Sequence, residues 1–199
     1  MKLKIETTLE RDIDLLIIEE FVSNKNFAEL FLRKLNLSNE YSIIEAIHSK
    51  TDSEFGESDI VFILNVNNKL HAIHIENKIN AIAMPEQNSR YHLRANKDIQ
   101  NGEYDEYSVM IVAPSKYLEK NKEAQKYEYS ITYEQLLEYF KSKNDIRSSF
   151  KSAMIERAIT DQITGYQWEA NPHVVRFCSA IHKYQDEHFP GMTKGTVAW

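Results

Sequence analysis

Two apolar segments joined by a pair of asparagines constrain the fold of this chain most strongly. Residues 59–66, DIVFILNV, and residues 69–79, KLHAIHIENKI, are rich in the residues that form buried strands. Asn67-Asn68 between them suits a hairpin turn. We therefore predict two antiparallel strands that lie side by side.

The second of these strands carries charge where a buried strand is normally apolar. Glu76, Asn77 and Lys78 interrupt the apolar run, and buried charge costs free energy unless it is paired or used. Strand side chains alternate between faces, so Glu76 and Lys78 point the same way. Hairpin pairing brings Asp59, at the start of the first strand, to the same end of the sheet. The resulting pattern is D-x16-E-x-K.

This group of side chains matches the chemistry of a divalent-cation site. Two carboxylates on neighbouring strands are hard oxygen ligands, which Mg²⁺ and Mn²⁺ prefer, and the carbonyl of Asn77 can supply a third oxygen. A lysine beside them can help to deprotonate an attacking water, or can stabilise the negative charge that builds on a phosphate. Two acids and a lysine around a cation indicate phosphodiester hydrolysis.

The rest of the chain predicts an α/β protein whose central mixed sheet is flanked by helices, with a helical C-terminal part. Asn26 is the expected cap of the second helix, and Thr132 with Gln135 forms a capping box for a later one. We expect a core over residues 1–140, and C-terminal helices and a tail over 141–199 that pack on it and that can begin a further segment. The expected helices cover residues 10–23, 27–35, 86–100, 115–126, 133–143, 147–165 and 172–188, and the further strands cover 41–49, 106–114 and 127–131.

GESDIVFILNV followed by HIENKIN resembles the PD-(D/E)xK nuclease superfamily. Asp59, Glu76 and Lys78 match its signature acid, second acid and lysine, and Ser58 stands where the name of the superfamily has proline. The next helix contains Q-x-x-x-Y, Gln87 to Tyr91, which is similar to a motif of RecB-like members. There the pair is associated with positioning the substrate and the active site. The resemblance implies a restriction-endonuclease-like fold and a Mg²⁺- or Mn²⁺-dependent nuclease that acts on DNA, with RNA left open.

The same resemblance implies a further metal-directed glutamate, on a helix before the first core strand. The segment LLIIEEFVS offers Glu19 and Glu20 within an otherwise apolar helix. Periodicity does not choose between them, and we favour Glu20.

A basic stretch follows the Q-x-x-x-Y motif on the same helix. Arg90, Arg94 and Lys97 either form a solvated helix face or contact the phosphates of a nucleic acid beside the metal. His74 shares the face of Glu76 and is interpreted as a packed histidine.

Composition sets the remaining bounds. The formal net charge of −6 counts against a passive DNA-coating protein, but less against an enzyme that concentrates carboxylates around cations. No apolar run is long enough to span a membrane, and the single cysteine, Cys178, fits a reducing cytoplasm. A homodimer stays open.

The sequence leaves the biological role open between restriction, anti-phage defence and repair. One alternative is a binding module that keeps the nuclease fold without its chemistry. Another is the nuclease half of a larger assembly, which the ending KGTVAW motivates.

Overall fold

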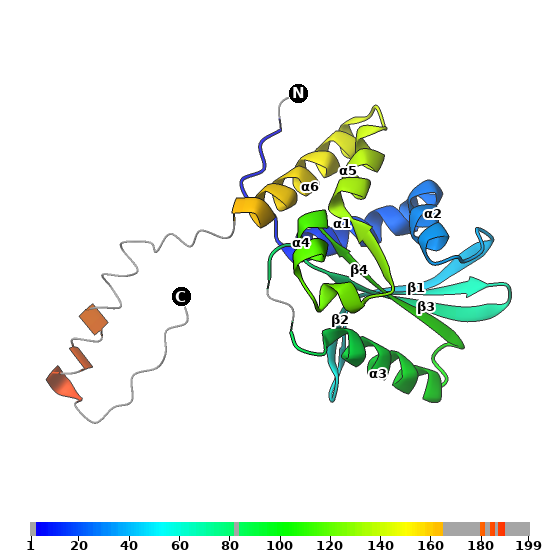
Figure 1. Cartoon of the computed structure of the whole chain (residues 1–199), viewed down its shortest axis with the longest axis horizontal. Coiled ribbons are helices and arrows are strands. Elements are labelled where there is room, and N and C mark those ends of the chain that lie inside the picture. Colours follow the sequence, from blue (N-terminus) through cyan, green and yellow to red (C-terminus); the bar gives the residue numbers. More distant parts are fainter. Residues whose placement is uncertain (1–2, 82–83, 165–179, 182–183, 186, 190–199) are drawn as a thin grey trace. The chain divides into compact units, whose positions relative to one another are not determined.

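A five-stranded mixed sheet organises the first part of the chain (Figure 1). The computed structural model describes residues 3–81, 84–164, 180–181, 184–185 and 187–189. The strand order is β1-β2-β3-β4-β5; the first three strands are antiparallel and the last three parallel. This confirms an α/β protein with a mixed sheet. The strands are β1 (Tyr41–Asp52), β2 (Gly56–Val66), β3 (Lys69–Asn77), β4 (Glu106–Ala113) and β5 (Tyr129–Thr132).

The predicted hairpin between β2 and β3 is confirmed. Asn67 and Asn68 have φ values of 53° and 63°, the left-handed conformation of the two-residue turns that match strand twist. The turn sets the register, with Val66 opposite Lys69 and Ile60 opposite Ile75. Strand β3 ends at Asn77, two residues before the predicted end, so Lys78 lies just beyond the strand.

Strand β1 differs most from its prediction. It continues to Asp52 instead of ending at residue 49, and only three residues separate it from β2. The register shifts between Ile43 and Glu45, and such a bulge interrupts the alternation of faces. Strict alternation would place Tyr41, Ile43, Glu45 and Ile47 on one face, but Tyr41 and Ile43 pack on the first core cluster whereas Ile47 packs with Val61 and Ile63 on the opposite face.

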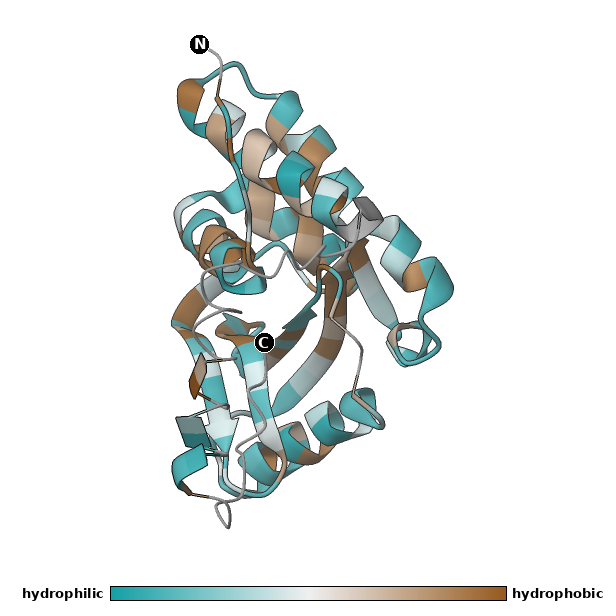
Figure 2. Ribbon diagram, turned by 90° about the vertical axis from the view of Figure 1, so that its left-hand side faces the viewer, coloured by the Kyte–Doolittle hydropathy of each residue, from teal (hydrophilic) through white to brown (hydrophobic). Residues whose placement is uncertain are grey.

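Helices cover both faces of the sheet (Figure 1). Buried side chains of the first core cluster join one face to α1 (Glu10–Ser23), α2 (Lys25–Lys34), α5 (Tyr133–Lys141) and α6 (Ile146–Thr164). Phe21 of α1 stacks on Phe62 of β2, with ring centroids 3.9 Å apart. On the other face lie α3 (Gln87–Gln100), α4 (Ser115–Lys120) and the short 3-10 helix η1 (Ala124–Lys126). Figure 2 shows hydrophobic residues on the strands and on the helices that cover them.

The helix ends confirm one predicted cap and correct another. Thr132 and Gln135 form the predicted capping box of α5. The cap of α2 is Asn24 instead of Asn26, because the Asn24 side chain accepts the backbone N–H of Asn26. The region predicted as one helix over 115–126 is α4 followed by η1. Helix α1 is apolar along most of its length, yet Leu15 is 46% exposed and Val22 is 51% exposed.

The chain divides into two compact units, residues 1–165 and 166–199. Helix α6 belongs to the first unit, whereas the expected boundary lay at residue 140. Most of the predicted helix over 172–188, Cys178 and the C-terminal tail lie outside the described residues. Within the described part of the chain, no helix is both long and apolar enough to cross a membrane.

Candidate active site

The acids and the lysine of the D-x16-E-x-K pattern meet at one end of the sheet, where β2 begins and β3 ends. The backbone N–H of Asn77 donates to Asp59 Oδ2 at 2.8 Å, which confirms the expected proximity. Glu76 is 1% exposed and Asp59 is half-buried. The end of β3 also lies beside the end of β4, its parallel neighbour, and the carboxyl ends of parallel strands are where α/β proteins build sites.

Glu76 has one satisfied oxygen and one unsatisfied oxygen. Lys78 Nζ lies 2.5 Å from Glu76 Oε1, and Gln87 Nε2 donates to the same oxygen at 2.6 Å. Glu76 Oε2 is buried and has no hydrogen-bond partner among the described residues. Native proteins leave few buried polar atoms in this state, and each one calls for an explanation.

Burial and neighbouring charges shift the pKa values of Asp59 and Lys78. Burial, with the nearby Glu76 carboxylate, raises the pKa of Asp59 to about 8. Lys78 shows the opposite balance: burial alone would lower its pKa, but Glu76 and Glu10 outweigh that effect and raise it above the ordinary value. Lys78 is thus a fixed positive charge beside the acids, which favours charge stabilisation among the two predicted roles.

The tyrosine of the Q-x-x-x-Y motif fastens the two strands beside the acids. Tyr91 is fully buried; its hydroxyl accepts the backbone N–H of Asp59 at 3.1 Å and donates to the carbonyl of Ile75 at 3.3 Å. Gln87, one turn earlier on α3, reaches Glu76. Residues four apart share a helix face, so the motif directs both side chains to the acids.

Asn77 connects the site to the opposite layer of helices. Its side-chain amide donates to Asp14 Oδ1 at 2.8 Å and to the carbonyl of Glu10 at 3.0 Å. Its side-chain carbonyl accepts the hydroxyl of Tyr133 at 2.7 Å. The backbone N–H and C=O of one strand residue point to the same edge. The backbone carbonyl of Asn77 therefore points to the edge that Asp59 occupies.

Glu10 and Asp14 contact the residues of this site and were not among those predicted from the sequence. Glu10 Oε1 accepts the backbone N–H of Ile79 at 2.8 Å, and Glu10 Oε2 lies 3.7 Å from Lys78 Nζ. Burial raises the pKa of Asp14 to about 6, although Asn77 and His48 oppose the shift. The available signal was the i, i+4 spacing of the two acids in ERDID, which places both on one helix face.

The prediction that Glu19 or Glu20 joins this site is wrong. Glu20 is buried, pairs with Lys151 of α6 and accepts the side-chain amide of Asn24; Glu19 pairs with Arg147 and Lys151. At 1.5 Å of rise per residue, Glu20 lies about 15 Å along α1 from Glu10. The buried acid is satisfied by a lysine of α6 instead of a metal.

The basic stretch of α3 divides into different roles. Arg94 is 5% exposed; it donates to Ser58 Oγ at 2.9 Å and to the carbonyl of Phe55 at 2.5 Å. Predicted phosphate contact is therefore wrong for Arg94, which is committed to the fold. Lys97 is paired with Asp52 at 2.6 Å. Arg90 is half-buried, and its side chain has no hydrogen bond or ion pair within the described part of the chain.

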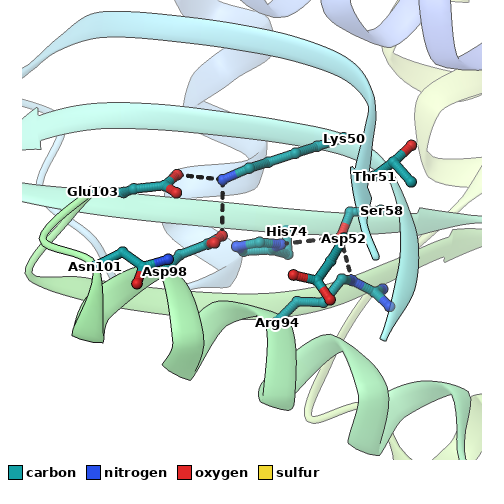
Figure 3. A pocket seen from close by; sticks show the side chains of 9 residues that line it. All are labelled: Lys50, Thr51, Asp52, Ser58, His74, Arg94, Asp98, Asn101 and Glu103. Carbon is teal, nitrogen blue, oxygen red and sulfur yellow. Dashed lines mark hydrogen bonds and ion pairs between the residues drawn. The ribbon is translucent and has the colours of Figure 1, made fainter. Parts of the chain in front are cut away.

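His74 belongs to a series of hydrogen bonds, of which Figure 3 shows the bond to Ser58 and the bond from Arg94 to Ser58. It is fully buried, with Nδ1 3.3 Å from Ser58 Oγ and Nε2 2.9 Å from the hydroxyl of Tyr104. Arg94 can only donate to Ser58, so the Ser58 hydroxyl is free to donate to Nδ1. The Tyr104 hydroxyl donates to Asp98 Oδ2 at 3.1 Å, so it accepts from Nε2.

These directions define a neutral His74 with its proton on Nε2. Burial lowers the pKa of His74 to about 3, which agrees with the neutral form. The series of hydrogen bonds ends at Lys50, which donates to Asp98 at 2.8 Å. A polar cavity of about 130 Å³ lies among these side chains. These hydrogen bonds hold the side chains of Ser58, which precedes Asp59, and of Arg94 in position. The guanidinium of Arg94 lies 4.1 Å from the centre of the Tyr91 ring.

The acid pair fits a divalent cation. A cation there would give Glu76 Oε2 a partner and would remove the repulsion that raises the pKa of Asp59. No three His, Cys, Asp or Glu side chains in the described residues are arranged to hold a metal. The donors that a cation would meet at this position are the two carboxylates and the backbone carbonyl of Asn77.

Comparisons with protein-family models, with curated proteins and with solved structures find no match for this chain.

Proposed function

We propose that this protein is a nuclease that hydrolyses phosphodiester bonds in DNA with Mg²⁺ or Mn²⁺, on a restriction-endonuclease-like fold. The observation that carries the proposal is the buried, unpartnered Oε2 of Glu76 beside Asp59. Two carboxylates and a lysine at a buried end of a sheet lower the stability of the fold. A cation-dependent reaction that needs these groups would explain why they are there.

Asp59, Glu76 and the backbone carbonyl of Asn77 would hold the cation. When bound, Mg²⁺ or Mn²⁺ supplies Lewis acidity toward a phosphate oxygen and lowers the pKa of a water molecule. Hard carboxylate and carbonyl oxygens are the ligands that these ions prefer.

Lys78 supplies the fixed positive charge at this position. Its ammonium group is held by Glu76 at 2.5 Å and lies 3.7 Å from Glu10, so it stays protonated. A protonated lysine stabilises the negative charge that develops on a phosphate during hydrolysis. It would donate to the phosphate and would not remove a proton from water.

Gln87 and Tyr91 would contribute by holding the two carboxylates in position. Gln87 holds Glu76 Oε1, which leaves Oε2 as the oxygen that is available to a cation. Tyr91 holds the backbone of Asp59 against that of Ile75. The spacing of the two carboxylates therefore depends on α3, and small errors in such spacing reduce catalysis strongly.

The proposal is tested by incubating the purified protein with plasmid DNA, linear duplex, single-stranded DNA and RNA in Mg²⁺, Mn²⁺ or EDTA. We expect cation-dependent cleavage of DNA that Glu76→Gln and Lys78→Ala reduce by at least a hundredfold, the typical effect of removing one charge-stabilising group. Glu45→Gln, an exposed acid of β1, is the matched control. Cleavage that persists in both site variants contradicts the proposal, as does Mn²⁺ binding without cleavage of any of these substrates.

A further inference from the structure

A hollow of about 330 Å³ opens beside the acid pair, between the β1–β2 turn and the first half of α3. Its walls include Phe55, Gly56, Asp59, Met84, Gln87 and Arg90. Asp59 and Gln87 belong to the candidate active site, so the hollow adjoins the acids directly. Its volume is at the small end of the range for small-ligand pockets.

The outer wall of the hollow is held in place before any ligand arrives. Asp52 accepts the backbone N–H groups of Glu54 and Phe55, both at 2.8 Å. Lys97 pairs with Asp52, and Arg94 donates to the Phe55 carbonyl. Arg94 and Lys97, two of the basic residues considered for phosphate contact, therefore fasten the β1–β2 turn to α3.

Glycine at position 56 is part of this construction. Its φ of +85° lies in the region that other residues rarely adopt. An added Cβ would lie 3.9 Å from Arg94 Nη1, which is an ordinary contact. The backbone conformation, and not a lack of space, is therefore what disfavours other residues at position 56. The turn can close tightly against α3 because glycine takes this conformation without strain.

The chemistry of the hollow combines one available cation with apolar surface. Arg90 has no ion pair or hydrogen bond to its side chain among the described residues, and arginine binds phosphate with two parallel hydrogen bonds. Met84 is 56% exposed. Lys97 Nζ lies 5.5 Å from the centre of the Phe55 ring, which helps to fix the orientation of the ring. Glu57 also lines the hollow, but it is exposed and accepts a hydrogen bond from Ser49.

We propose that this hollow binds the nucleotide next to the scissile phosphate as an unpaired nucleotide, with its phosphate on Arg90 and its base against Phe55 and Met84. The identity of the ligand rests on the proposed nuclease function. A base can lie on an aromatic ring only when its face is free, and bases inside a duplex have both faces covered by their neighbours. The site would therefore prefer single-stranded DNA, or a strand end that has opened.

The test measures binding without cleavage. A fluorescein-labelled twelve-nucleotide oligothymidine and a duplex of equal length are titrated by fluorescence anisotropy in Mg²⁺. The protein carries Glu76→Gln, so that the probe is not consumed. We expect Phe55→Leu to weaken binding of the single strand about tenfold, within the range measured for loss of one stacked base, and to leave the duplex unchanged. Phe55→Tyr keeps a ring and should retain binding, and Arg90→Ala should weaken binding of the single strand about tenfold.

Arg33→Ala on α2, an exposed arginine, is the control for general loss of charge. Thermal melting of each variant checks that it is folded. The proposal is overturned if Phe55→Leu and Arg90→Ala bind the single strand as Arg33→Ala does, or if Phe55→Leu weakens the duplex equally. If binding depends on Phe55 and Arg90 but the wild type cleaves nothing, the subsite stands and the nuclease function fails. If the wild type cleaves and binding ignores both residues, the nuclease function stands and the subsite fails.

Discussion

Replacing Asp59 with asparagine should stabilise the metal-free protein while removing its affinity for metal. In the folded protein burial and Glu76 raise the pKa of Asp59 to about 8, whereas an unfolded aspartate has a pKa near 4. At pH 7 the unfolded chain is ionised and the folded site resists ionisation, so this carboxyl destabilises the fold. Asparagine removes the charge and still offers an oxygen to the backbone N–H of Asn77.

The expected gain in the free energy of unfolding follows from the shift in the pKa of Asp59. Between the ordinary pKa and pH 7 lie about three pH units, and at about 1.4 kcal/mol per unit the upper bound is ~4 kcal/mol. Asp59 is half-buried and Lys78 partly compensates its charge, so screening reduces the expected gain to about 1–2 kcal/mol. For a protein of this size that corresponds to a rise of roughly 3–6 °C in Tm.

The assay is thermal melting in EDTA at pH 8 and at pH 5. A group whose pKa is raised in the folded state binds a proton there first, so its destabilising effect fades as the pH falls through about 8 toward 4. The gain from Asp59→Asn should therefore be larger at pH 8 than at pH 5.

Asp52→Asn is the matched control of opposite sign. Its pKa is lowered to about 2, first by the hydrogen bond from Lys97 and then by those from Phe55 and Glu54, so its substitution should lower Tm. A lower Tm of Asp59→Asn at pH 8, or a gain in Tm that does not change with pH, would show that this carboxyl does not destabilise the fold.

Three further predictions concern neighbouring parts of the structure. Because burial lowers the pKa of His74 to about 3, its contribution is present above pH 6.5 and is lost as the pH falls. In urea unfolding the stability gap between wild type and His74→Gln should thus shrink by about 2 kcal/mol from pH 7.5 to pH 5; a constant gap would contradict the neutral assignment. Glu20→Ala should destabilise the fold by about 1–3 kcal/mol, because the buried Lys151 keeps only Glu19 as a partner and the side-chain amide of Asn24 loses its acceptor. Calorimetry should nevertheless show unchanged Mn²⁺ affinity; reduced affinity would restore Glu20 as a metal ligand. Tyr91→Phe removes the bridge between Asp59 and Ile75 and should lower kcat more than it raises KM; an effect on KM alone would argue against a positioning role.

Local patterns predicted the parts of the fold that local forces determine. The β2–β3 hairpin follows from apolar strands and two asparagines that accept positive φ. The capping box at Thr132 depends on two residues three positions apart. The proximity of Asp59 to Glu76 follows from the hairpin register, so it could be predicted from spacing alone.

The errors have a common cause in partners that lie far away in the chain. Glu20 pairs with Lys151, 131 positions later, and nothing near Glu20 in the sequence indicates that lysine. Arg94 is buried because it reaches Ser58 and Phe55 on the adjoining turn. Glu10 was overlooked because acids are common in the first turn of any helix, where they need no metal to be favourable.

A structure of the protein soaked with Mn²⁺ tests the central claim most directly, since the anomalous signal of manganese identifies its position. We expect a peak between the carboxylates of Asp59 and Glu76, within coordination distance of Glu76 Oε2, and loss of that peak in Glu76→Gln. Saturating Mn²⁺ that leaves this position empty, or that binds instead at Glu19 and Glu20, would contradict it.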